Sequence, residues 1–298
     1  MTKVLITGGT GLVGKQLQKC LTAKGYAVAV LTRTPKKSNE FYWNIKKQFI
    51  DKKAFSNTTH IIHLAGAGIA DKRWTQKRKK EIIYSRVESA NLLFSCVKKY
   101  KVRLKGFISA SGIGYYGAVS TNTIFEETDK PFGDFISKVC INWERASNQF
   151  IELNIPVTIF RIGIVLSKNG GVLKKLNTPL FLITLGKATQ YMPWIHVQDL
   201  CLLYLKAVED TKISGTYNAI APEHHSNKTF TKELSKHVKK PFLAKGIPAF
   251  ILKIILGKLS IILLNGSRVS SKKTQKIHRF QFPKLNLALK DIFKMDKI

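Results

Sequence analysis

The sequence predicts an α/β protein with a doubly wound parallel sheet and a smaller, partly helical C-terminal lobe. Short apolar runs alternate with amphipathic helical patterns from Lys3 to Arg161, and this alternation is typical of a parallel sheet with helices on both faces. From about Ala221 onward a partly helical pattern replaces it and ends in a basic, aromatic stretch at residues 268–283. A glycine-rich segment directly follows the first apolar run, so we expect it at a strand-to-helix turn of the sheet.

The first βαβ unit is expected at the N-terminal end of the chain. Residues 3–7 predict a short buried strand, residues 12–24 an amphipathic helix that Gly25 closes, and residues 27–31 a second strand. Further buried strands, with helical patterns between them, are predicted at residues 60–65, 106–110 and 156–161.

The pattern changes after Arg161. Residues 163–186 are rich in Leu, Gly and Asn, whereas residues 194–199 open an apolar helix that runs to Glu209 and returns the chain to the sheet. The prediction is therefore a sheet domain and a C-terminal lobe that contributes to substrate binding. The sheet domain comprises residues 1–162 and 191–220, and the lobe comprises residues 163–190 and 221–298.

Composition bounds the class of protein. A chain of 298 residues with 44% apolar side chains is long enough to bury a full core. The four cysteines, Cys20, Cys96, Cys140 and Cys201, lie too far apart for a zinc cluster or a disulfide framework, so we expect reduced thiols and no metal site. The strand pattern begins at Val4 with no apolar stretch of signal-peptide length before it, which favours a cytoplasmic location.

The formal charge of +32 is the extreme feature of the composition. Such a charge suggests nucleic acid or an anionic membrane as a partner, but the lysines are spread along the whole chain. Short basic runs at residues 77–80 and 272–273 form neither a stripe nor a recognisable reading helix. We therefore expect solvated lysine-rich faces and no specific nucleic-acid site, although phosphate-bearing ligands are favoured.

Residues 247–264 are the most apolar stretch of the chain. Lys253 and Lys258 interrupt it, whereas a membrane span needs about 20 predominantly apolar residues. We expect a packed helix here and no membrane span.

The glycine-rich segment covers residues 7–14 and reads TGGTGLVG. Gly8 permits a tight turn, Gly11 lets the backbone approach a pyrophosphate, and Gly14 allows the helix and strand to pack closely. The helix N-terminus attracts the anion. This context predicts the phosphate-binding turn of a Rossmann fold, with Thr10, Leu12 and Val13 as the other cofactor contacts of the loop.

The end of the second predicted strand indicates which dinucleotide binds. An acidic residue there would hold a ribose 2′-hydroxyl, but this chain has Thr32 and Arg33. A guanidinium offers a planar fork to a 2′-phosphate, and Thr32 adds a hydroxyl. We therefore expect NADP(H), the alternative being that Arg33 is a solvated loop charge.

Together with the glycine loop, short motifs along nearly the whole chain resemble the extended short-chain dehydrogenase/reductase superfamily. Within it, the chain is similar to the atypical branch of epimerase-family, or nucleoside-diphosphate-sugar-epimerase-like, proteins, which carries a small C-terminal domain. The motifs are HLAG at 63–66, IADKRW at 69–74, SR at 85–86, SASGIGYYG at 109–117, DF at 134–135, VC at 139–140, WE at 143–144, FRIGIVL at 160–166, WIH at 194–196 with Asp199, and LNGSRV at 264–269.

The resemblance implies further site residues. Leu64, Ala65 and Gly66 would contact the cofactor, and Ser111 matches the serine that polarises the substrate oxygen. Lys138 matches the lysine that depresses the pKa of a catalytic tyrosine and holds the nicotinamide ribose.

The tyrosine that should precede the lysine by four residues is missing. Asp134 stands at that position, and the next residue, Phe135, has no hydroxyl. Tyr115 or Tyr116, just after Ser111, could supply a phenol, or both could simply pack and shape the loop.

The sequence therefore predicts an NADP(H)-binding, atypical short-chain dehydrogenase/reductase-like protein. It is expected to be an oxidoreductase or epimerase acting on a small polar or nucleotide-linked substrate of unassigned identity, and a homodimer is compatible with the sequence. The alternative is a non-catalytic NADP(H)-responsive regulator, since some members of the family carry names that suggest a link to cell division.

Overall fold

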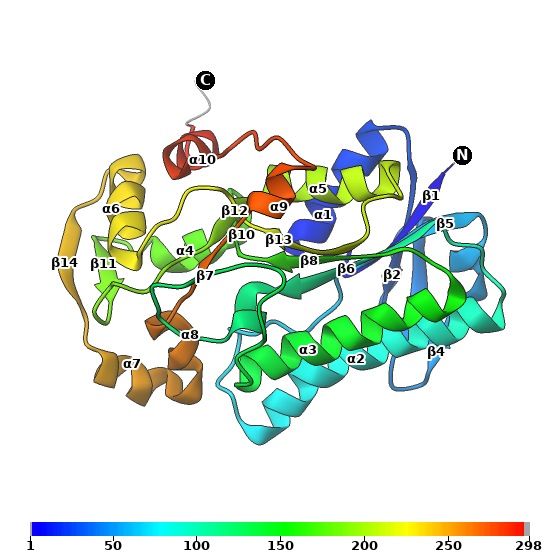
Figure 1. Cartoon of the computed structure of the whole chain (residues 1–298), viewed down its shortest axis with the longest axis horizontal. Coiled ribbons are helices and arrows are strands. Elements are labelled where there is room, and N and C mark those ends of the chain that lie inside the picture. Colours follow the sequence, from blue (N-terminus) through cyan, green and yellow to red (C-terminus); the bar gives the residue numbers. More distant parts are fainter. Residues whose placement is uncertain (1, 295–298) are drawn as a thin grey trace.

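The computed structural model describes residues 2–294, and its centre is an eight-stranded sheet (Figure 1). The strands are β1 (Lys3–Thr7), β2 (Ala27–Thr32), β3 (Glu40–Asn44), β4 (Phe49–Ile50), β5 (Thr58–His63), β6 (Gly106–Gly112), β8 (Val157–Ile162) and β13 (Gly215–Ala219). They lie in the order β13-β8-β6-β5-β1-β2-β3-β4. All neighbours are parallel except β3 and β4, which are antiparallel at one edge.

Side-chain alternation along β1 shows why both faces of the sheet are buried. Val4 and Ile6 belong to the apolar cluster on one face, and Leu5 belongs to the cluster on the other. A strand that is covered on both faces needs an uninterrupted apolar run, which is what the sequence supplies.

Two helices cover each face. α1 (Leu12–Ala23) and α5 (Val197–Glu209) pack side by side on the first face, and α2 (Gln76–Lys99) and α3 (Phe135–Asn148) on the second (Figure 1). Short 3₁₀ helices lie in the connections: η1 (Lys52–Phe55), η2 (Ile113–Tyr116), η3 (Gln149–Leu153) and η4 (Gly257–Ser260).

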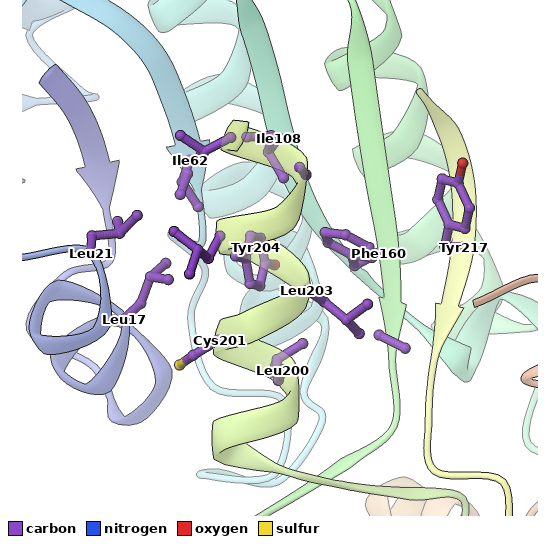
Figure 2. Packing of buried hydrophobic residues seen from close by; sticks show 14 of the residues in the cluster. Leu17, Leu21, Ile62, Ile108, Phe160, Leu200, Cys201, Leu203, Tyr204 and Tyr217 are labelled. Atoms are coloured by element: carbon purple, nitrogen blue, oxygen red, sulfur yellow. The ribbon is translucent and has the colours of Figure 1, made fainter. Parts of the chain in front are cut away.

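The first face carries the larger apolar cluster. Leu17 and Leu21 of α1 and Tyr204 of α5 pack onto Ile62 and Phe160 of the strands (Figure 2). These side chains are almost completely buried, and each such burial contributes roughly 1.5–3 kcal/mol. The helices are therefore held against the sheet by transfer of apolar area from water.

The C-terminal lobe is built on a small parallel pair of strands, β11 (Leu182–Leu185) and β14 (Phe242–Ile247). Its buried cluster includes Leu182, Phe230 and Leu289, together with Trp194 of the sheet domain. The helices of this region are α4 (Val172–Leu176), α6 (Asn227–Val238), α7 (Ala249–Leu256), α8 (Ile261–Leu264), α9 (Lys272–Gln275) and α10 (Leu285–Ile292).

Short strands join the lobe to the sheet domain. A three-stranded sheet has the order β10-β9-β12, from β9 (Ile164–Ser167), β10 (Gly170–Gly171) and β12 (Trp194–His196), and β7 (Ile124–Phe125) pairs with β15 (Arg268–Val269). The buried carboxylate of Asp199, at the start of α5, accepts hydrogen bonds from the backbone of Gln281 and Phe282 and from His278. Part of the C-terminal segment thus returns to the sheet domain.

The expectation of one packed helix in residues 247–264 was wrong in part. The stretch forms α7 and α8 with η4 between them, and only Leu252 of α7 is buried. Phe250, Ile254 and Ile255 are 64%, 71% and 60% exposed. None of the helices within residues 2–294 is long and apolar enough to cross a membrane.

The predicted fold class is confirmed by the parallel, doubly wound sheet and its smaller C-terminal region. The five strands predicted for the sheet domain all form, as β1, β2, β5, β6 and β8. The chain returns to the sheet through β13 beside β8. Strand β3, which lies next to the edge strand β4, was not predicted, because its residues EFYWN mix polar and aromatic types without the apolar run of a central strand.

Candidate functional site

The glycine loop lies where the strand order reverses direction. From β1 the chain proceeds outward through β2 and β3 on one side, and then returns to build β5, β6, β8 and β13 on the other. In open parallel sheets this reversal leaves a crevice at the carboxyl ends of the two central strands. Here those ends are followed by Gly8, after β1, and Leu64, after β5.

Two glycines of the loop stand where no side chain fits. Gly8 has φ of +70°, and a Cβ built on it would lie 2.9 Å from the carbonyl carbon of Leu64. A Cβ on Gly14 would lie 2.3 Å from the carbonyl oxygen of Gly8. The loop and the first turn of α1 are therefore packed backbone against backbone.

The N-terminus of α1 is open to an anion. Gly11 is the N-cap residue and provides no side-chain acceptor, and the first turn of the helix contains no acidic residue. The first N–H groups of a helix lack partners within it, and the helix dipole favours negative charge at this end. A phosphate group suits both properties.

A buried polar network holds the segment after β5 against the loop. The Thr7 hydroxyl accepts hydrogen bonds from the backbone N–H groups of Leu64 and Ala65, both at 3.1 Å, and lies 2.8 Å from Nδ1 of His63. Burial lowers the pKa of His63 to about 4, so the ring is neutral at pH 7. Since Thr7 already accepts two hydrogen bonds, its own proton goes to Nδ1, which leaves the His63 proton on Nε2.

Arg86 and Ser85 of α2 hold the segment after β5 through hydrogen bonds to its backbone. Ser85 accepts a hydrogen bond from the Ala67 N–H, and Arg86 donates one to the Ala67 carbonyl. A Cβ on Gly66 would lie 2.8 Å from the Arg86 guanidinium carbon. The predicted cofactor residues Leu64, Ala65 and Gly66 are thus fixed beside Gly8.

Arg33 follows β2 directly, and its side chain is exposed. Within residues 2–294 its guanidinium has no hydrogen bond or ion pair. The carboxylate of Glu40, on the neighbouring strand β3, accepts a hydrogen bond from the Lys36 N–H at 2.7 Å. Thr32 is buried, and its hydroxyl accepts the Thr34 N–H at 3.3 Å. Arg33 is therefore available to an anionic ligand, and Thr32 shapes the turn that presents it.

Ser111, at the end of β6, belongs to a buried ionic network. Its hydroxyl donates to Oε1 of Glu144 at 2.7 Å. Arg161 donates to both oxygens of the same carboxylate, each at 2.9 Å. Burial alone lowers the pKa of Arg161, but the ion pair with Glu144 outweighs it and raises the pKa above its ordinary value. Such bidentate, charge-assisted contacts fix both side chains.

The register of α3 brings residues other than Lys138 to Ser111. A Cβ on Gly114 would lie 2.6 Å from Cγ1 of Ile136 and 3.6 Å from Sγ of Cys140, and Glu144 bonds Ser111. These three α3 residues are four apart and share one face.

Lys138 is two positions from Ile136 and Cys140, so it points to the opposite side of α3, where it is exposed. Contrary to the expectation from the motif, the structure does not bring Lys138 and Ser111 together. Asp134 is the N-cap residue of α3, and its carboxylate accepts the N–H groups of Ser137 and Ala118. The positions that face Ser111 with the spacing of a tyrosine–lysine pair carry an aliphatic side chain and a thiol.

The two candidate tyrosines have different environments. Tyr116 is fully buried, donates to Asn218 at 2.8 Å and accepts from Arg161 at 3.0 Å. Burial raises its pKa to about 12. Tyr115 is half-buried, and the Arg161 guanidinium stacks 3.3 Å from the centre of its ring. No hydrogen bond is made by the Tyr115 hydroxyl within the described part of the chain.

Sequence reasoning missed the pairing of Glu144 with Arg161. Both residues stand in recognised motifs, but a single glutamate in a helical segment is not distinguished by the sequence from a solvated charge. The signal that could have found it is the four-residue spacing of positions 136, 140 and 144, which places them on one helical face. The hairpin of β9 and β10 was also missed: Gly171 lies against Leu12 at the start of α1.

Known proteins are similar to this chain over nearly its whole length. Residues 4–219 match the NAD dependent epimerase/dehydratase family, and residues 247–292 match a domain of unknown function, DUF1731. An epimerase family protein of Staphylococcus aureus is 33% identical over 304 residues, which cover 99% of this chain and 100% of the relative. An epimerase family protein of Staphylococcus saprophyticus is 32% identical, and the alignment covers 98% of this chain and 99% of the relative.

Solved structures of similar fold cover the chain as fully. The human epimerase family protein SDR39U1 (isoform 2), solved with NADPH, superposes with a TM-score of 0.86 at 26% identity and covers 98% of this chain and 99% of its own. A nucleoside-diphosphate sugar epimerase of Corynebacterium glutamicum superposes with a TM-score of 0.80 at 27% identity, covering 98% of this chain and 58% of its own.

Proposed function

Because the chain belongs to the NAD dependent epimerase/dehydratase family, we propose that it binds NADP(H) in the crevice between the glycine loop and residues 64–66. The observation that carries the proposal is the cradle itself. Gly8 and Gly14 leave no room for side chains, and α1 starts beside them with an open N-terminus at the reversal of the strand order. The human structure solved with NADPH supports the same cofactor.

The preference for NADP(H) over NAD(H) rests on Arg33. A pyrophosphate would lie at the first turn of α1, because the free backbone N–H groups there can donate hydrogen bonds to its oxygens. The ribose 2′-phosphate would then lie near the end of β2, where the exposed Arg33 makes no hydrogen bond or ion pair within residues 2–294. Thr32 holds this turn through its bond to the Thr34 N–H.

Titration of the purified protein with NADPH and NADH, followed by fluorescence, tests the assignment. We expect tighter binding of NADPH, and for Arg33→Ala a loss of roughly tenfold or more in NADPH affinity with NADH affinity unchanged. Arg103→Ala removes an exposed charge at the amino end of β6, the opposite edge of the sheet, and serves as the matched control. Equal affinities for the two nucleotides, or equal losses in the two variants, would contradict the proposal.

The reaction that this arrangement supports best is hydride transfer with a small carbonyl or alcohol substrate, by an oxidoreductase or an epimerase. The bound cofactor supplies or accepts the hydride. For reduction, Ser111 would have to turn its one hydroxyl proton from Glu144 to the carbonyl oxygen, and the phenol of Tyr115 would give that oxygen a proton as the carbonyl carbon is reduced. Tyr115 is chosen over Tyr116 because the Tyr116 hydroxyl is buried and already engaged.

Tyr115→Phe and Tyr116→Phe form a matched pair. Tyr115→Phe should reduce NADPH consumption with a panel of carbonyl substrates by a factor on the order of 10² or more, with NADPH affinity retained. Tyr116→Phe should mainly lower stability, because it removes a buried hydrogen bond to Asn218. Full turnover in Tyr115→Phe would exclude this tyrosine as the acid.

A second candidate function is a non-catalytic NADP(H)-responsive regulator. The observation that favours it is that Ser111 already donates to Glu144, while Ile136 and Cys140 occupy the helix positions facing it. A regulator predicts tight NADPH binding, no turnover with any carbonyl or alcohol, and no change in either property for Tyr115→Phe.

A further inference from the structure

A cavity of about 650 Å³ lies between the first turn of α3 and the α7–η4–α8 segment of the lobe. Its lining combines apolar side chains, among them Trp74, Phe135 and Leu264, with the amines of Lys253 and Lys258. We propose that this cavity binds the substrate, and that the substrate is an anion with an apolar body: an aryl or alkyl carboxylate, sulfonate or phosphate ester.

The apolar wall is a rigid aromatic surface. Trp74 is 7% exposed, and its ring packs edge to face on Phe135 with 4.8 Å between centroids. Its indole N–H donates to the Ile69 carbonyl, so the ring presents apolar surface without an unsatisfied donor. Leu264 is half-buried on the opposite side of the cavity. Such walls favour flat or branched apolar groups.

The charged groups at the cavity are almost all cationic. Lys253 and Lys258 are exposed, and within residues 2–294 neither makes a hydrogen bond or an ion pair. Lys79 lies over the Phe135 ring, with its nitrogen 4.6 Å from the centroid. The carboxylate of Asp134 accepts two backbone N–H groups, so it is engaged away from these amines.

The sequence around the cavity reinforces the positive field. No aspartate or glutamate occurs from residue 234 to residue 290, the segment that supplies α7, η4 and α8. Two free ammonium groups without nearby carboxylates from their own segment attract an anionic ligand and raise its local concentration.

Apart from the charged groups, the polar side chains that line the cavity are few and are bonded to their own segment, which disfavours a polyhydroxylated sugar. The Ser260 hydroxyl donates to Gly257, and the Asn265 amide donates to Ile261. A sugar that entered would leave several hydroxyls unpaired, at a cost for each. An apolar body between the rings with its anionic group at the lysines meets no such cost.

The cavity adjoins the reaction end of the crevice. Ile136 lines it and also contacts Gly114, which follows Ser111 by three residues. A ligand seated here would thus be separated from the loop after Ser111 by the side chain of Ile136. The identification of this ligand as the substrate rests on the proposed hydride-transfer function. The prediction that the cavity binds an apolar anion does not depend on that function.

The test uses the full chain and 8-anilinonaphthalene-1-sulfonate, an apolar anion, in fluorescence and calorimetric titrations without NADPH. We expect one site, competition by decanoate, and binding roughly tenfold weaker in the double variant Lys253→Gln/Lys258→Gln. Lys239→Gln/Lys245→Gln removes two exposed lysines of the same lobe outside the cavity, and should bind as the wild type does.

Two further variants separate the cavity from the exposed face of α7. Leu264→Trp should fill the cavity and abolish the site, with the fold checked by circular dichroism, whereas Phe250→Ser on the exposed face should leave it intact. Unchanged affinity in the Lys253/Lys258 double variant, loss of binding in Phe250→Ser, or displacement of the probe by UDP as readily as by decanoate would overturn the proposal. NADPH titration decides the proposed function separately.

Discussion

The two ends of the crevice are built by different means. At the phosphate end, Gly8 and Gly14 fix the shape because backbone atoms occupy the space of a side chain. At the reaction end, Ser111 is fixed by side chains from α3 and β8, above all Glu144 and Arg161. A site set by backbone contact is encoded locally, whereas one set by facing side chains depends on helix register. The phosphate end can therefore be predicted from a short motif, whereas the reaction end cannot.

The largest effect is expected from breaking the ion pair at the reaction end. Glu144→Gln keeps the shape of the side chain but leaves Arg161, which is 4% exposed, without a counter-charge. We expect a loss of roughly 3–5 kcal/mol in the free energy of unfolding, measured by urea denaturation. Lys236→Gln disrupts an exposed pair with Glu233 and should cost less than about 1 kcal/mol. Similar losses in the two variants would mean that the reaction end is not rigidly held.

The next effect is a pH dependence at the phosphate end. Burial lowers the pKa of His63 from 6.5 to about 4. In the unfolded chain His63 is therefore protonated below about pH 6.5, whereas in the folded protein it is protonated only below about pH 4. Stability should therefore be full above pH 6.5 and fall as the pH decreases, by ~3 kcal/mol at pH 4 from this residue.

His60 behaves similarly, with a pKa of about 4 caused first by burial. The measurement is therefore a difference in slope, from unfolding curves between pH 7 and pH 4. His63→Gln should remove part of the pH slope, whatever it does to absolute stability. If the free energy of unfolding depends on pH as steeply in the variant as in the wild type, a residue other than His63 causes the pH dependence.

A smaller effect on stability, but a large one on binding, is expected from Gly14→Ala. The added methyl group would lie 2.3 Å from the Gly8 carbonyl oxygen, and such overpacking costs roughly 1–3 kcal/mol while it distorts the loop. NADPH affinity should fall at least about tenfold. Gly25→Ala, where no atom lies within 4 Å of the added methyl, should lose stability from its φ of +81° but keep NADPH affinity.

The smallest effect on stability is expected from Ser111→Ala. The variant removes one hydrogen bond to Glu144 but leaves the bidentate pair with Arg161 in place, so unfolding should change by roughly 0.5–1.5 kcal/mol. If the protein is an enzyme, turnover should fall by much more than that while NADPH binding is kept. Unaltered turnover would remove Ser111 from the reaction.

The fold could be predicted because its signals are local. Apolar runs of strand length and the glycine spacing in residues 7–14 depend only on nearest neighbours in the chain. Strand β3 lacks such a run and was not predicted. The division of residues 247–264 into two helices was also hidden, since composition does not reveal the turn at Gly257, where φ is +58°.

The reaction end could be predicted only in part. Ser111 was located by its motif, but the motif does not show which face of the following helix packs against it. An offset of two residues turns a helix by about 200°, and the sequence alone does not show whether Lys138 or its neighbours Ile136 and Cys140 face Ser111. The pairing of Glu144 with Arg161 spans 17 residues, and only the packing of α3 against β8 brings the two charges together.

The central claim, that the crevice at the reversal of the strand order holds the phosphates of NADP(H), is tested most directly by hydrogen–deuterium exchange with and without NADPH. The account predicts slower exchange at residues 8–14 and 64–66 together, with the amino-edge residues 101–105 unchanged. Protection confined to basic surface segments, or absent from the glycine loop while NADPH is bound, would contradict it.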